Sequence, residues 1–120
     1  MKVIIADDSK VMRNIIQNAL RPMGIEVIHA GNGQEVFEQL EIHGSKIGVI
    51  FMDWNMPGMS GLECLRLLKK NEEYRDIPVL MISTEAEKDK VAMAREAGAK
   101  GYLSKPFTPE ELIKFINESI

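Results

Sequence analysis

Five short apolar runs divide the chain, and the stretches between them carry apolar residues at helical spacing. The runs cover residues 2–6, 25–29, 48–52, 78–82 and 101–104. Short runs rich in β-branched residues are typical of strands that are buried on both faces. Strands that alternate with helices predict a parallel sheet with right-handed crossovers and helices on both sides. The pattern therefore predicts an α/β fold with five strands and five helices, but it does not give the strand order.

Residues that begin or end helices support this division. Helix caps and stops are expected at Asn32 with its partner Glu35, Gly44, Ser60, Gly98 and Thr108. Pro22 should end the first helix near residues 21–24, because proline lacks an amide hydrogen and clashes with the preceding turn. The fourth helix, residues 87–97, carries only a thin stripe of small apolar residues, which predicts light packing.

Length, charge and cysteine content restrict the class of protein. The 120 residues fit one domain, residues 1–120, and the net charge of −3 comes without basic clusters. Neither nucleic acid nor a membrane surface is therefore an expected partner. We find no apolar stretch near the ~20 residues that cross a bilayer, and no signal peptide. Cys64 is the single cysteine and is expected to be a packing residue. We expect a cytoplasmic monomer.

Polar residues follow four of the five predicted strands. They are Asp7 and Asp8 after the first, Asp53 after the third, Ser83 or Thr84 after the fourth, and Lys105 after the fifth. Each of them taken alone is explained by a helix cap, a turn or a solvated surface. Parallel strands, however, bring their carboxyl ends to one edge of the sheet, where ligands of open α/β sheets bind. The combination therefore predicts a site at this edge.

Three converging carboxylates predict a bound cation. Two carboxylates ~4 Å apart repel by ~4 kcal/mol at an effective dielectric constant near 20, and Lys105 supplies only one positive charge. An all-oxygen site favours a hard divalent ion such as Mg²⁺, which Mn²⁺ can replace. His29 and His43 are isolated in the sequence, and we expect both on the surface.

A hydroxyl, a lysine and Mg²⁺ together suit the three oxygens of a phosphoryl group. The group that remains to attack phosphorus is a carboxylate, which would give an acyl phosphate. Asp53 is the best candidate, because it stands alone after the strand that looks most central. The sequence therefore predicts phosphoryl acceptance on an aspartate.

Four motifs, in order along the whole chain, resemble a known family. They are Asp7-Asp8, Asp53-Trp54-Asn55-Met56-Pro57 with Gly61, Pro78 to Ser83, and Gly101 to Phe107 with its Lys105-Pro106 pair. The sequence resembles the receiver domain of bacterial response regulators, and most closely the stand-alone chemotaxis regulators. The resemblance implies a single doubly wound (βα)5 domain, flavodoxin-like, with the parallel strand order 2-1-3-4-5.

The resemblance also implies roles for site residues. Asp53 would receive a phosphoryl group from a sensor histidine kinase, and Lys105 would contact that group. Mg²⁺ would be held by Asp8, Asp53 and the backbone carbonyl of Asn55, with Asp7 acting partly through water. The Lys105–Pro106 bond would be cis, as it is in the family.

The resemblance further implies a switch and an output. Ser83 and Tyr102 would respond to the phosphoryl group, because it brings about −2 charge and three acceptor oxygens to a loop hydroxyl. The output surface would be residues 88–97, Tyr102 and residues 108–120. Asn55 and Glu85 occupy the two positions that tune dephosphorylation. Its protein target would be a flagellar motor switch component or another signalling protein.

One departure and two alternatives affect this interpretation. Thr84 stands where the family generally has a small residue, and a β-branched residue there would narrow the mouth of the site and so affect the rates of phosphorylation and hydrolysis. An aspartyl-phosphate hydrolase of the haloacid dehalogenase type would need a second aspartate at Asn55. A nucleotide or flavin binder would need a glycine-rich phosphate loop. A receiver-like module that binds partners without phosphorylation would not need all the acceptor-site residues that are present here.

Overall fold

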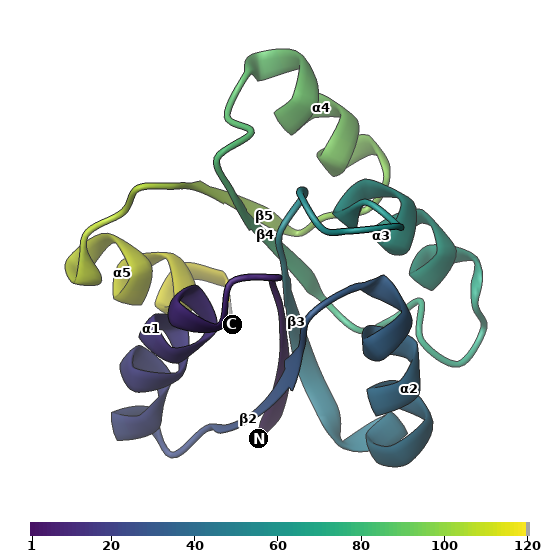
Figure 1. Ribbon diagram of the computed structural model, residues 1–120, viewed down its shortest axis with the longest axis horizontal. Coiled ribbons are helices and arrows are strands. Elements are labelled where there is room, and N and C mark those ends of the chain that lie inside the picture. The colour runs from purple at the N-terminus through teal and green to yellow at the C-terminus, as the bar shows by residue number, and fades with distance from the viewer. Residues whose placement is uncertain (120) are drawn as a thin grey trace.

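The computed structural model describes residues 1–119, so Ile120, the last residue of the predicted output surface, lies outside it. Strands and helices alternate along the chain, with two short 3₁₀ turns (Figure 1). The elements are β1 (Lys2–Ala6), α1 (Lys10–Leu20), η1 (Arg21–Met23), β2 (Glu26–Ala30), α2 (Gly33–His43), η2 (Gly44–Lys46), β3 (Ile47–Met52), α3 (Gly61–Lys70), β4 (Val79–Ser83), α4 (Lys88–Glu96), β5 (Gly101–Ser104) and α5 (Pro109–Ser119).

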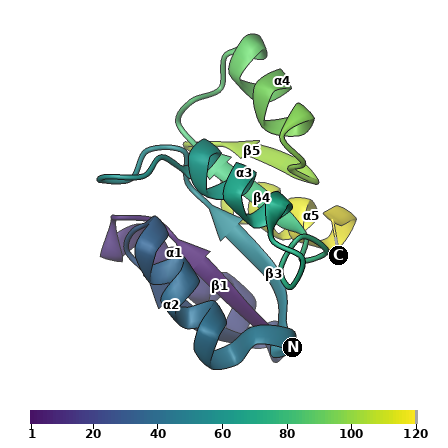
Figure 2. The ribbon, with the colours of Figure 1, turned by 90° about the vertical axis from the view of Figure 1, so that its right-hand side faces the viewer.

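The strands form one parallel sheet in the order β2-β1-β3-β4-β5. This order confirms the flavodoxin-like arrangement and makes β3 the middle strand. Helices α1 and α5 cover one face of the sheet, whereas α2, α3 and α4 lie on the other (Figures 1 and 2). Because all five strands run parallel, their carboxyl ends lie together at one edge of the sheet.

Two hydrophobic cores, one on each face of the sheet, result from the alternation of side chains along the strands. Ile4 and Ile50 face α2 and α3, whereas Val3 and Phe51 face α1 and α5. Cys64 is fully buried in the first core, and burial raises the pKa of its thiol to about 12, which fits the expected packing role. Across the described residues, none of the helices has the length and apolar character that crossing a bilayer requires.

The predicted caps are present and set the helix ends. The side chains of Asn32 and Ser60 each accept a hydrogen bond from the backbone amide three residues ahead, and Ser9, which was not predicted as a cap, does the same for α1. As expected from Pro22, α1 ends at Leu20 and continues only as one 3₁₀ turn.

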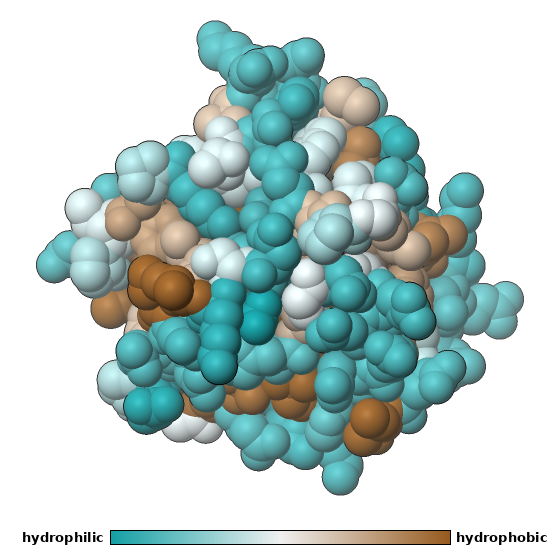
Figure 3. All heavy atoms as spheres, viewed as in Figure 1, coloured by the Kyte–Doolittle hydropathy of each residue, from teal (hydrophilic) through white to brown (hydrophobic). Residues whose placement is uncertain are grey.

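Some boundaries and exposures differ from the sequence prediction. The second and fourth strands each end one residue later than predicted, because Ala30 pairs with Ala6 and Ser83 pairs with Ser104. Helix α1 has a wider apolar stripe than the sheet can cover, which leaves Ile15 45% exposed. Ile15 lines a groove of about 360 Å³ between α1 and α5, where a hydrophobic patch is visible in Figure 3.

Candidate functional site

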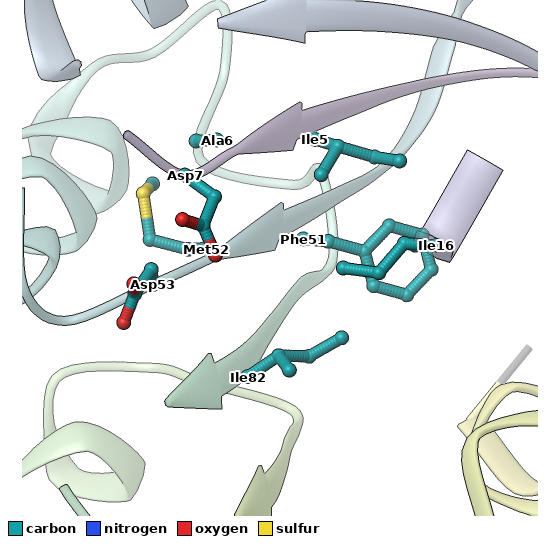
Figure 4. A pocket seen from close by; sticks show the side chains of 8 residues that line it. All are labelled: Ile5, Ala6, Asp7, Ile16, Phe51, Met52, Asp53 and Ile82. Carbon is teal, nitrogen blue, oxygen red and sulfur yellow. The ribbon is translucent and has the colours of Figure 1, made fainter. Parts of the chain in front are cut away.

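Three carboxylates converge where β1 and β3 end. One oxygen from each of Asp7, Asp8 and Asp53 lies within 4.8 Å of the others. Asp7 and Asp53 are buried, whereas Asp8 is exposed. Figure 4 shows Asp7 and Asp53 just beyond the ends of their strands, with apolar side chains such as Phe51 behind them. The structure therefore brings together the three acidic residues that the sequence predicted.

Lys105 reaches this cluster from the end of β5. Its Nζ lies 2.6 Å from Oδ2 of Asp7 and 3.2 Å from Oδ2 of Asp53, and its side chain is only 10% exposed. The peptide bond between Lys105 and Pro106 is cis, as expected. One lysine leaves two negative charges of the cluster unbalanced. An all-oxygen donor set with this charge and spacing fits a hard divalent cation, as the sequence predicted.

The loop after β3 holds Asp53 through its backbone. The amide of Asp53 donates to the carbonyl of Ala6 at 2.9 Å, and its Oδ1 accepts from the amide of Asn55 at 3.2 Å. Gly61 begins α3 directly against this loop, so a Cβ there would lie 1.9 Å from the backbone oxygen of Asp53. Only glycine allows the start of α3 to approach the backbone of Asp53 so closely.

Asp7 is held by an arginine that sequence reasoning missed. The guanidinium of Arg13 donates to the carbonyl of Asp7, and its Nε donates to Nδ1 of His29 at 3.1 Å. The other ring nitrogen of His29 lies 3.0 Å from Oε1 of Gln17, to which it donates in the neutral tautomer. His29 is therefore not isolated as the sequence suggested, although it remains partly exposed near the end of β2. Burial, together with the charges of Arg13 and Lys10, lowers the pKa of His29.

The predicted switch residues, Ser83 at the end of β4 and Tyr102 in β5, both contact the loop after β4. Ser83 is fully buried and its Oγ accepts from the amide of Glu85 at 3.3 Å. Thr84 is exposed, and its Oγ1 accepts from the side-chain amide of Asn55 at 3.4 Å. The hydroxyl of Tyr102 donates to the carbonyl of Glu85. Tyr102 and the β4–α4 loop are therefore already in contact beside the acidic cluster.

Lys90 in α4 also reaches this loop and was missed in the sequence. It pairs with Glu85 and lies over the ring of Trp54, the residue that follows Asp53. Lysines on exposed helices are common, so the signal that would have found it is spatial: only the fold places α4 beside the loop after β3.

The fold and this site define a receiver domain, and the comparison with known families agrees. The response regulator receiver domain family matches residues 3–117, and the chain belongs to this family. The match favours the receiver interpretation over the aspartyl-phosphate hydrolase alternative.

Named relatives are similar over nearly the whole chain. The chain is 41% identical over 113 residues to the chemotaxis protein CheY1 of Helicobacter pylori, covering 93% of this chain and 90% of that protein. It is 40% identical to the chemotaxis protein CheY of Pseudomonas aeruginosa, with the same coverage. Among solved structures, the chemotaxis response regulator CheY4 of Vibrio cholerae superposes with a TM-score of 0.89 at 34% identity, covering 99% of this chain and 98% of that one.

Proposed function

We propose that this protein is a phosphorylation-activated signalling switch whose acceptor is Asp53. A sensor histidine kinase is the proposed donor: the P–N bond of its phosphohistidine breaks as a bond forms between phosphorus and a carboxylate oxygen of Asp53. The observation that carries this proposal is the acidic cluster at the end of the middle strand, closed by a nearly buried lysine. Its relatives of known name are chemotaxis proteins, which supports the regulatory class.

Mg²⁺ is the proposed cofactor, and Mn²⁺ can replace it. Asp8, Asp53 and the backbone carbonyl of Asn55 would hold the ion, with Asp7 acting partly through water. When bound, the ion supplies positive charge to the phosphoryl oxygens. Lys105 already sits between Asp7 and Asp53, and it is placed to hydrogen-bond a phosphoryl oxygen once Asp53 is modified.

The proposed switch connects the acceptor to the surface formed by α4, β5 and α5. A phosphoryl group brings about −2 charge and three acceptor oxygens, which favours a turn of the Ser83 hydroxyl toward it. The hydroxyl of Tyr102 holds the carbonyl of Glu85, two residues beyond Ser83, so movement of this loop reaches β5. Such a local event can bias a two-state loop. Autodephosphorylation by water, with Asn55, Thr84 and Glu85 setting its rate, would end the signal.

The proposed output is binding of a protein partner. The named relatives are chemotaxis proteins, and on that ground the flagellar motor switch is the proposed target class. We propose that residues 1–120 act as one receiver domain in this role.

The test is labelling of the protein with a small acyl phosphate, followed by mass spectrometry of the modified peptide. We expect Mg²⁺-dependent modification of Asp53 that is sensitive to hydroxylamine and absent from Asp53→Ala, whose circular dichroism should match the wild type. Glu63→Gln, a change at an exposed acid on α3, is the matched control and should be modified normally. Modification of another residue, or none in the presence of Mg²⁺, would contradict the proposal; the latter result would favour a binding role independent of phosphorylation.

A further inference from the structure

Lys90 connects the start of α4 to the loop just before it and to a second loop that is distant in the sequence. Its Nζ lies 2.8 Å from Oε2 of Glu85 in the β4–α4 loop and 5.7 Å from the ring centroid of Trp54 in the β3–α3 loop. Lys90 itself lies in the first turn of α4. The side chains of Lys90 and Glu85 are 33% and 26% exposed, so the pair is neither a free surface contact nor a buried one.

This contact lies at the rim of the acceptor site. Trp54 follows Asp53 directly, and Glu85 comes two residues after the buried Ser83. The side-chain amide of Asn55, from the loop after β3, donates a hydrogen bond to Oγ1 of Thr84 on the neighbouring loop. The carboxylate of Glu85 is therefore a negative charge at the entrance, in addition to those of the cluster inside.

The charge of Glu85 matters because every phosphoryl donor is an anion. A donor that approaches Asp53 is repelled by the acidic cluster, and an unpaired rim carboxylate would add to that repulsion. Lys90 cancels this charge and fixes the position of the carboxylate through a hydrogen bond and its contact with the Trp54 ring.

We propose that Lys90 is a positioning residue that holds Glu85 at the rim and neutralises it, and so speeds the entry of anionic phosphoryl donors to Asp53. This inference rests on the proposed function. Glu85 brings a negative charge to the rim, and the ammonium group of Lys90 reaches that charge at 2.8 Å.

A purely structural role for Lys90 makes a different prediction. If the lysine only stabilised the start of α4, its loss would act through folding, would not depend on the charge at residue 85, and would not be corrected by salt. The two roles are separated by a double-mutant cycle between Lys90 and Glu85.

The experiment measures the rate of Asp53 labelling by acetyl phosphate, a dianion, at low ionic strength with saturating Mg²⁺. The variants are Lys90→Met, Lys90→Arg, Glu85→Gln and the double variant Lys90→Met/Glu85→Gln. Lys88→Met is the matched control, because it removes the same charge from the same helix and Lys88 makes no salt bridge among the described residues. Phosphoramidate, which carries less negative charge, serves as the second donor.

We expect Lys90→Met to slow labelling by acetyl phosphate roughly two- to five-fold, the size of a partly exposed charge interaction. Lys90→Arg should restore the rate, the effect should be smaller with phosphoramidate, and it should shrink as salt is added. In the Glu85→Gln background the loss should largely disappear, whereas the effect of Lys88→Met should be the same in both backgrounds.

Two results overturn the inference in distinguishable ways. In the first, the wild type is labelled on Asp53 and the Lys90→Met variant is labelled at the same rate, or Lys90→Met slows labelling equally in the wild-type and Glu85→Gln backgrounds. Lys90 then has no role through Glu85. If the wild type is not labelled on Asp53 at all, the proposed function fails and this inference fails with it.

Discussion

Replacement of Lys105 by methionine tests the electrostatic balance of the site. Lys105 bonds to Asp7 at 2.6 Å and to Asp53 at 3.2 Å, with only 10% of its side chain exposed. Each contact is worth about 5–6 kcal/mol of attraction at an effective dielectric constant near 20, although dehydration of the ions offsets most of it. Removal of one partner from a buried ion pair typically costs about 3–5 kcal/mol. We expect Lys105→Met to lower the free energy of unfolding by about 3 kcal/mol, the lower end of this range, because Asp8 is exposed and the cluster is therefore partly solvated.

The assay is urea unfolding at neutral pH with a chelator and then with Mg²⁺. The cost of Lys105→Met should be largest without metal, because bound Mg²⁺ supplies positive charge to the carboxylates that lose their lysine partner and so stabilises the folded variant more than the folded wild type. In the Asp7→Asn background the cost should fall by at least a third, since one of the two contacts is already absent. Lys70→Met, a change at an exposed lysine that ends α3, is the control and should stay within about 0.5 kcal/mol of the wild type. A cost for Lys105→Met no larger than that of the control, or one unchanged in Asp7→Asn, would refute the reasoning.

Two further predictions concern the loop glycine and the half-buried histidine. Gly61→Ala should lower the free energy of unfolding by about 3 kcal/mol or more, because its Cβ would lie 1.9 Å from the backbone oxygen of Asp53. Gly31→Ala is the control, because a Cβ there would make only ordinary contacts, and it should cost little. Equal costs for the two variants would show that the loop after β3 moves freely to admit the Cβ. The folded-state pKa of His29 lies below 6.5, so the unfolded chain binds more protons and the unfolding free energy should fall as the pH is lowered through 6.5. His29→Gln should flatten this part of the pH profile, and an unchanged profile in this variant would disprove the role given to His29.

The fold was predictable because each local signal agreed with the others. The apolar runs, the caps at Asn32 and Ser60, and the stop at Pro22 all depend on residues close in the chain, and the structure confirms them. The strand order required the family resemblance, because periodicity does not determine which strands are neighbours. The ends of β2 and β4 were placed one residue early, since pairing with β1 and β5 extends these strands beyond their apolar runs.

The acidic cluster was predictable for a related reason. A parallel sheet brings residues that follow its strands to one edge, so Asp7, Asp53 and Lys105 could be placed together from their positions in the sequence. The contact of Arg13 with His29 and that of Lys90 with Trp54 could not, because each joins a helix to a residue that is distant in the sequence. An arginine or lysine in an amphipathic helix carries no local sign of such a contact.

The measurement that tests the central claim most directly uses the fluorescence of Trp54, the single tryptophan, which stands next to Asp53. Mg²⁺ is titrated first, and beryllofluoride, which imitates the phosphoryl group of an aspartyl phosphate, is added afterwards. We predict a saturable change with Mg²⁺ and a second, Mg²⁺-dependent change with beryllofluoride, the second one absent from Asp53→Ala. A wild-type protein that responds to neither, or an Asp53→Ala variant that keeps the beryllofluoride response, would contradict the assignment of Asp53 as the phosphoryl acceptor.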